Sequence, residues 1–175
     1  MYLLVCALIV VGVVALDQLT KWLVMLNMEI GESVPVIKGV FNFTYIRNPG
    51  AAFGSFSNSR WVFILISTVM IALMIFYLVK YKPASKLFYI PASMIIGGGI
   101  GNMIDRLFYG ESFGNGTVVD FIDFCAFPNL WSWIFNVADS FVCVSAVVLF
   151  GYLFIDILKE EKEAKSKSNN SENNE

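Results

Sequence analysis

Four long apolar runs dominate the pattern of hydrophobic and polar positions along the chain. Each approaches the roughly 20 residues that an α-helix needs to cross the ~30 Å hydrocarbon core of a bilayer. The first run lacks the basic start and the short apolar core of a cleaved signal peptide, so we expect it to be retained as a span. The predicted transmembrane helices cover residues 2–26, 61–79, 87–104 and 133–155.

Two segments between the spans have a different pattern. Residues 34–56 alternate β-branched and aromatic residues with polar ones and are interrupted by Gly39, Pro49 and Gly50. This pattern predicts a small β-sheet and loop region resting on the membrane surface. In the second segment, the turn dipeptide Asn115-Gly116 precedes a short apolar stretch that predicts a further strand.

Composition supports a membrane protein. Apolar residues make up 57% of the 175 residues and charged residues only 15%, whereas soluble domains carry about 25% charged residues. The predicted fold class is an all-α membrane protein, with a single four-helix domain over residues 1–158 and the small sheet on its outer face. Residues 159–175 are rich in Lys, Glu, Ser and Asn, which predicts a frayed helix followed by a disordered cytoplasmic tail.

Basic residues predict the orientation of the spans. Lys80, Lys82 and Lys86 lie between the second and third spans, and further lysines follow the fourth. Under the positive-inside rule these segments face the cytoplasm, as do both termini. The regions 27–60 and 107–130 then lie outside. A net charge of −2 and the absence of a basic patch give no indication of nucleic-acid binding.

Two absences restrict the chemistry. The chain has no histidine, which excludes a Ser-His-Asp or Cys-His site and a histidine-ligated zinc. Cys6, Cys125 and Cys143 are widely separated and form no CxxC pair, so neither a metal site nor a disulfide framework is indicated. We expect no metal or cofactor, and any catalysis must use carboxylates, amines, hydroxyls or amides.

Most polar side chains of the spans gather toward the outer end of the predicted bundle. Asp17 and Lys21 are one helical turn apart and can pair, and Asn102, Asp105 and Arg106 share one helix face. Such groups join helices as readily as they take part in chemistry, so both interpretations stay open. The nearby run Gly97 to Gly99 predicts close helix packing.

Asp139 is less easily explained by structure alone. It precedes a long uncharged run in the fourth span and has no basic residue within a turn on its own helix. A lone carboxylate in a membrane is costly and therefore suggests function. Asp120, in the apolar stretch VVDFI, is its natural partner, because two neighbouring carboxylates can share a proton and activate a water. Asp123 competes with Asp120 for this role, and the residues alone leave the choice open.

Five stretches carry a resemblance to a known family. They are DQLTK (17–21), RNPGAAFG (47–54), GNMIDR (101–106), VVDFIDF (118–124) and FNVADS (135–140). In this order and at this spacing they resemble the motifs of the bacterial lipoprotein signal peptidases, also called signal peptidase II.

The resemblance implies a membrane aspartic endopeptidase of the bacterial cytoplasmic membrane. Its substrates would be prolipoproteins, cut just before a cysteine that bears a diacylglyceryl group, and we expect a monomer surrounded by membrane lipid. The match places the catalytic pair on Asp120 and Asp139. It assigns supporting or substrate-binding roles to Asn48, Gly50, Asn102, Asp105, Arg106, Asn136, Asp17 and Lys21.

Two further expectations concern the outer loops. The segment from Arg106 to Asp120 is several residues longer than is usual in the family, and residues 111–116 predict an inserted hairpin. Aromatic residues of the outer region are expected to clamp the substrate from above. They are Trp22, Phe41, Phe43, Tyr45 and Phe53.

Two other classes of function compete with a peptidase. A small proton-coupled transporter would also use membrane carboxylates, but it predicts polar residues along the whole depth of the bundle, whereas the inner half is apolar. No internal repeat is visible either. In a non-catalytic scaffold, Asp120 and Asp139 would be structural.

Overall fold

The computed structural model describes residues 1–50, 60–127 and 133–172. It contains four long helices and one four-stranded antiparallel sheet, which confirms the predicted fold class. The helices are α1 (Tyr2–Asn27), α2 (Arg60–Tyr81), α3 (Lys86–Phe108) and α4 (Val137–Glu172). The strands are β1 (Ser33–Ile37), β2 (Phe41–Asn48), β3 (Val118–Phe124) and β4 (Ile134–Phe135), paired in that order.

The four helices are long and apolar enough to span a bilayer. Helix α3 contacts α1, α2 and α4 and is the central helix of the bundle. Its spanning segment is 39% buried within the protein, against 6% for α2 and for α4. The apolar surfaces of α2 and α4 are therefore largely exposed on the outside of the bundle, as expected of helices whose surrounding solvent is hydrocarbon.

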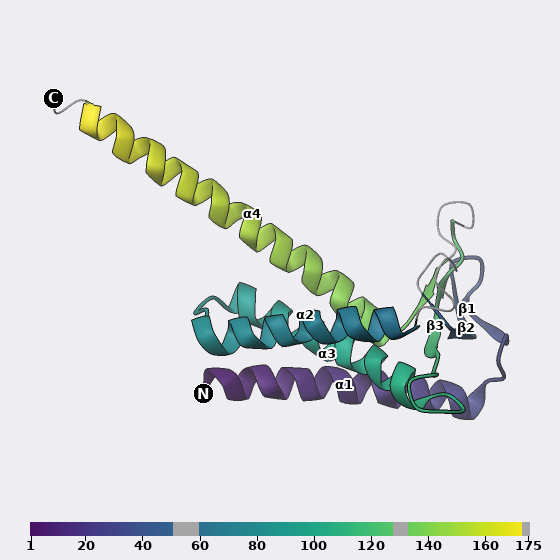
Figure 1. Ribbon diagram of the computed structural model, residues 1–175. Helices are drawn as coiled ribbons and strands as arrows, with labels where there is room; N and C mark the ends of the chain where they lie inside the picture. The colour runs from purple at the N-terminus through teal and green to yellow at the C-terminus, as the bar shows by residue number, and fades with distance from the viewer. Residues whose placement is uncertain (51–59, 128–132, 173–175) are drawn as a thin grey trace.

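The sheet lies at one end of the bundle, beyond the end of α1 and beside the start of α4 (Figure 1). Strands β1 and β2 form a hairpin whose turn contains Gly39 at a φ of +75°, a conformation that suits glycine. Strand β3 pairs with β2 although more than 60 residues separate them in sequence. The sheet thus brings the two predicted outer regions together at one site.

Glycines of α3 allow the close packing that the sequence predicted. A Cβ atom added to Gly97 would lie 2.8 Å from Cβ of Val13 on α1. One added to Gly98 would lie 2.6 Å from the carbonyl oxygen of Ala138 on α4. Small residues at these positions let both neighbouring backbones approach α3.

Replacing Gly98 with alanine is expected to lower the stability of the bundle by about 1–3 kcal/mol, because the added methyl group overlaps the backbone of α4. Gly12→Ala is the matched control, since a Cβ atom at Gly12 meets no atom within 4 Å. Unfolding by SDS titration in mixed micelles measures both variants. Equal stability of the two variants would contradict this account of the glycine run.

The fourth span differs from its predicted bounds. Ile134 and Phe135, expected to be helical, form strand β4 because their backbones pair with β3 opposite Asp123 and Ile122. Helix α4 begins only at Val137, and its membrane-compatible segment extends to Lys162.

The C-terminal end of α4 is longer than the frayed helix that the sequence predicted before a disordered tail. The helix continues to Glu172, through most of the segment 159–175. Residues 159–165 consist only of Lys, Glu and Ala, which are good helix formers, so the helix can continue through them. Figure 1 shows this end of α4 diverging from the other helices.

The prediction of a hairpin at residues 111–116 is wrong. This part of the chain forms no strand and folds back on the end of α3. The amide groups of Gly114 and Gly116 donate to the carbonyls of Leu107 and Arg106, each at 3.0 Å. These bonds satisfy carbonyl groups that have no partner at a helix C-terminus. The strand predicted after Asn115-Gly116 is present as β3.

Candidate active site

Asp120 lies on β3 and is only 1% exposed. Its Oδ2 accepts a hydrogen bond from Nδ2 of Asn48 at 2.9 Å, and its Oδ1 accepts one from Nδ2 of Asn136 at 2.7 Å. Asn48 ends β2, and Asn136 lies between β4 and α4. The amide of Asn48 is itself oriented, since its Oδ1 accepts the backbone N–H of Gly50 at 3.0 Å. Both oxygens of the carboxylate are therefore held by amide donors.

Asp139 is positioned by the local sequence at the start of α4. Its Oδ2 accepts the backbone N–H of Asn136 at 3.2 Å, and its own N–H donates to Oδ1 of Asn136 at 2.9 Å. This reciprocal pattern is a capping box with the carboxylate three residues after the N-cap. Nδ2 of Asn102 donates to the other carboxylate oxygen at 2.7 Å. The stretch FNVADS thus fixes the carboxylate while it starts the helix.

Asn136 joins the two carboxylates. Its Nδ2 donates to Asp120 and to Oδ1 of Asn102, the latter at 3.0 Å. Its backbone N–H donates to the carboxylate of Asp139, and its side-chain Oδ1 accepts the N–H of Asp139. The residue is completely buried. The structure therefore brings Asp120 and Asp139 around a single amide, although they lie on different elements.

The electrostatics of the pair favour a shared proton. Burial, and next the negative charge of Asp139, raises the pKa of Asp120 from 3.8 to about 7. Hydrogen bonds from Asn48 and Asn136 stabilise the ionised form and act in the opposite direction. The positive charge of Arg106 acts on both carboxylates, and its guanidinium lies 5.5 Å from the ring centre of Phe63.

A buried ion cluster lies directly behind these residues. Nζ of Lys21 lies 2.8 Å from Oδ2 of Asp17 and 2.9 Å from Oδ2 of Asp105, and it donates to Oδ1 of Asn102 at 2.9 Å. The two carboxylates and the lysine are completely buried. Asn102 connects this cluster to Asp139, because its Oδ1 accepts a hydrogen bond from Lys21 and its Nδ2 donates one to Asp139.

The two carboxylates of this cluster also hold the backbone on which the candidate pair lies. Oδ1 of Asp17 accepts the N–H of Ala138 at 3.0 Å, and Oδ2 of Asp105 accepts the N–H of Val119 at 3.0 Å. Ala138 and Val119 immediately precede Asp139 and Asp120 in sequence. The geometry thus favours the supporting interpretation of Asp17, Lys21 and Asp105.

Sequence reasoning missed Gln18 and Tyr109. Nε2 of Gln18 donates to Oδ1 of Asp105 at 2.9 Å and lies 3.2 Å from Oδ2 of Asp17, while its Oε1 accepts the hydroxyl of Tyr109 at 2.8 Å. The signal in the sequence was a second polar residue beside Asp17 inside an apolar span. The partner Tyr109 carries no such signal, because it follows the end of α3.

Asp123 lies apart from this site. Its Oδ2 accepts a hydrogen bond from the hydroxyl of Thr44 at 2.7 Å, and it is only partly buried. Asp120 and Asp123 are an odd number of residues apart, so an extended strand directs them to opposite faces. Phe53, one of the aromatic residues expected to clamp the substrate, lies outside the described residues.

Among the residues that the structure describes, no group of three His, Cys, Asp or Glu side chains could hold a metal ion. Asp17 and Asp105 are instead paired with the ammonium of Lys21.

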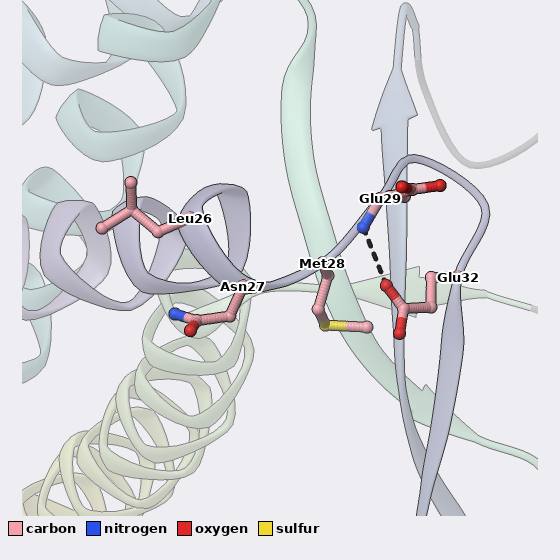
Figure 2. Close-up of a pocket in the computed structure, with 5 residues that line it drawn as sticks. All are labelled: Leu26, Asn27, Met28, Glu29 and Glu32. Carbon is pink, nitrogen blue, oxygen red and sulfur yellow. Dashed lines mark hydrogen bonds between the residues drawn. The ribbon is translucent and has the colours of Figure 1, made fainter.

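A hollow in the surface lies between the end of α1 and β1, and neither Asp120 nor Asp139 lines it (Figure 2). Figure 2 shows the backbone N–H of Glu29 directed at the carboxylate of Glu32, a hydrogen bond of 2.8 Å. None of the candidate residues lines this hollow, so its shape says nothing about the site. Its lining residues are Leu26, Asn27, Met28, Glu29 and Glu32.

Comparison with solved structures supports the same architecture. A structure described as a bacterial membrane enzyme superimposes with a TM-score of 0.77 at 33% identity, covering 87% of this chain and 89% of the other. A second structure with the same description gives a TM-score of 0.74 at 33% identity, with 85% and 92% covered.

Comparison with known sequences identifies the family. The family model for signal peptidase (SPase) II matches residues 9–155. A lipoprotein signal peptidase of Halalkalibacterium halodurans is 40% identical over 157 residues, which cover 90% of this chain and 94% of the relative. One from Bacillus pumilus is 44% identical over 143 residues, covering 82% and 88%. The chain therefore belongs to the signal peptidase II family, the bacterial membrane peptidases that remove signal peptides from lipoproteins.

Proposed function

We propose that the protein is a membrane aspartic endopeptidase that cleaves diacylglyceryl-modified prolipoproteins just before the lipidated cysteine. The observation that carries the proposal is the arrangement around Asn136, which holds Asp120 and Asp139 through its amide, its carbonyl oxygen and its backbone. No histidine is available, so this carboxylate pair is the chemistry that the chain offers for hydrolysis.

In the proposed mechanism the pair holds one proton between its members. The ionised carboxylate takes a proton from a water molecule, and the protonated carboxylate polarises the scissile carbonyl. The attacking water forms the new C–O bond, and the C–N bond of the peptide breaks as the carboxylate passes the proton taken from the water to the leaving amine. Arg106 lies close enough to act on both carboxylates electrostatically, which supports a role in binding the substrate backbone.

The position of the pair suits a lipid-bearing substrate. Asp139 lies in the first turn of a membrane-compatible helix, and Asp120 lies in the sheet just beyond it. The acyl chains of the substrate can stay in the bilayer while the peptide bond reaches the carboxylates. Lys80, Lys82 and Lys86 lie around the α2–α3 connection, so the positive-inside rule places both termini in the cytoplasm and the site near the outer face. The enzyme is proposed to act as a monomer.

The geometry favours a peptidase over the competing functions. In a proton-coupled transporter, ionisable residues would continue along the bundle. Here the fully buried charges, Asp17, Lys21 and Asp105, cluster behind the carboxylate pair at the sheet end. In a non-catalytic scaffold, lipoprotein processing in cells would survive the loss of both Asp120 and Asp139.

The direct test is cleavage of a diacylglyceryl-modified prolipoprotein by the purified protein in detergent. Mass spectrometry of the products should find the released signal peptide and a mature chain that begins with the lipidated cysteine. The same prolipoprotein without the diacylglyceryl group is the control substrate and should be cleaved far more slowly. Intact lipidated substrate after prolonged incubation would overturn the proposal.

The pH dependence of cleavage should reflect the carboxylate pair. Asp120, with a pKa of about 7, holds a proton below that pH and loses it above. Once both carboxylates are ionised, no acid is left to polarise the carbonyl, so kcat/KM should fall as the pH rises through about 7. The apparent value belongs to the pair.

A matched pair of variants tests this assignment. Asn48→Ala removes a hydrogen bond that lowers the pKa of Asp120, so the alkaline limb of the pH profile should move to higher pH. Thr44→Ala, on the same strand, removes a bond to Asp123 and should leave that limb in place. An unmoved limb in Asn48→Ala would contradict the assignment to Asp120.

A further inference from the structure

The segment between α3 and β3 packs firmly against the start of α2. Gly114 has a φ of +75° and lies against the indole ring of Trp61, so closely that a Cβ atom there would overlap the ring. The bonds from Gly114 and Gly116 to carbonyls of α3 hold the other side of the segment. Residues 109–117 therefore form a fixed surface at the sheet end of the bundle.

Aromatic side chains of this surface and of the adjoining ends of α2 and α3 are exposed. The rings of Phe108 and Phe113 meet edge to face with centres 5.7 Å apart. Both residues stay exposed, at 63% and 66%, and Trp61 is 60% exposed. Exposed side chains of this size, held together by a glycine turn, indicate a contact that is absent from the isolated chain.

The neighbouring elements indicate what covers the aromatic surface. Trp61 is the first residue of the membrane-compatible segment of α2, and Phe108 is the last residue of that of α3. The aromatic surface therefore continues the lipid-facing surface of both helices at the point where they leave the hydrocarbon. Aromatic side chains are enriched at this depth, where their rings lie among the lipid headgroups and the first methylene groups.

The polar residues of the segment fit the same arrangement. Glu111, Ser112 and Asn115 are exposed, whereas Tyr109 turns inward and donates to Gln18. The segment thus combines an outward apolar ring with charged and polar residues that keep contact with water, as expected of an element that rests in an interface.

We propose that residues 109–117 form a membrane-interface contact in which Phe113, together with Phe108 and Trp61, inserts between phospholipid molecules beside the candidate active site. The segment leads directly from α3 into the strand that carries Asp120. The contact would fix the height of that strand relative to the bilayer. This inference depends on the membrane location of the chain and holds whether or not Asp120 and Asp139 are catalytic.

Photo-crosslinking of the full chain in phosphatidylglycerol vesicles tests the proposal. The photoreactive residue p-benzoylphenylalanine replaces Phe113 in one variant and Glu111 in a second, matched variant. A third variant carries it at Leu65, which is 64% exposed on the spanning surface of α2 and calibrates the yield of lipid adducts. After irradiation, intact-mass spectrometry measures the fraction of chain that has gained one phospholipid.

Position 113 is expected to give a lipid adduct within about threefold of the yield at position 65, and about tenfold above that at position 111, because only the aromatic side lies among acyl chains. Three results would overturn the proposal. They are a yield at position 113 no higher than at position 111, the absence of an adduct at position 113, and crosslinking of position 113 to a second copy of the chain.

Discussion

Replacing either Asp120 or Asp139 with asparagine is expected to reduce the cleavage rate by at least about 10²–10⁴-fold, the usual contribution of general acid–base catalysis. Asparagine keeps the shape of the side chain but can neither accept a proton from water nor carry the shared one. Initial rates with a diacylglyceryl-modified prolipoprotein measure the effect. At position 120 asparagine keeps one acceptor oxygen but turns its NH2 group toward the amide of Asn48 or Asn136, so SDS titration of each variant must show that it is folded.

The chain offers a matched control on the same strand. Asp123→Asn removes a carboxylate three residues further along β3. That carboxylate accepts a hydrogen bond from Thr44, which is not part of the candidate active site. We expect this variant to cleave at nearly the wild-type rate. Normal cleavage by a folded Asp120→Asn protein, or loss of cleavage in Asp123→Asn alone, would contradict the proposed pair.

The largest loss of stability is expected from Lys21→Met. The substitution keeps the length of the side chain but leaves the carboxylates of Asp17 and Asp105 buried without their cation. Breaking a buried ion pair by removing one partner costs about 3–5 kcal/mol. The backbone N–H bonds at Ala138 and Val119 depend on these carboxylates, so activity should fall together with stability.

SDS titration in mixed micelles measures the change in the free energy of unfolding. Lys38→Met, in the exposed turn of the β1–β2 hairpin, removes the same charge without breaking a buried contact and should change stability by less than about 0.5 kcal/mol. Adding Asp17→Asn to Lys21→Met should recover part of the loss, because one uncompensated charge disappears. Equal stability of Lys21→Met and Lys38→Met would contradict the role of the cluster.

The sequence predicted the helices well because their determinant is local. A span requires about 20 apolar residues in succession, and that requirement can be read directly from the chain. The prediction failed where contacts between elements compete with local preference. Ile134 and Phe135 continue an apolar run, yet pairing with β3 makes them a strand. Residues 111–116 have the composition of a hairpin turn but bond to the end of α3.

The candidate residues could be named from the sequence, but their relationships could not. A carboxylate within an apolar run is conspicuous because its burial is costly, and this alone singled out Asp139. Gln18 was missed because the charged pair Asp17 and Lys21 beside it drew the attention, and Tyr109 because it follows the end of a helix. Their importance comes from a hydrogen bond between residues 91 positions apart.

The sequence by itself determined that four helices span a membrane, that histidine chemistry is excluded, and that polar groups gather at one end. The tertiary structure decided how those groups are connected. It directed Asp120 toward Asn136 and Asp123 toward Thr44. It also brought Asp17 and Asp105 to the backbone N–H groups of the residues that precede Asp139 and Asp120, where their carboxylates accept hydrogen bonds. The physical reason is that periodicity determines which face of an element a residue lies on, whereas packing of distant elements determines what that face meets.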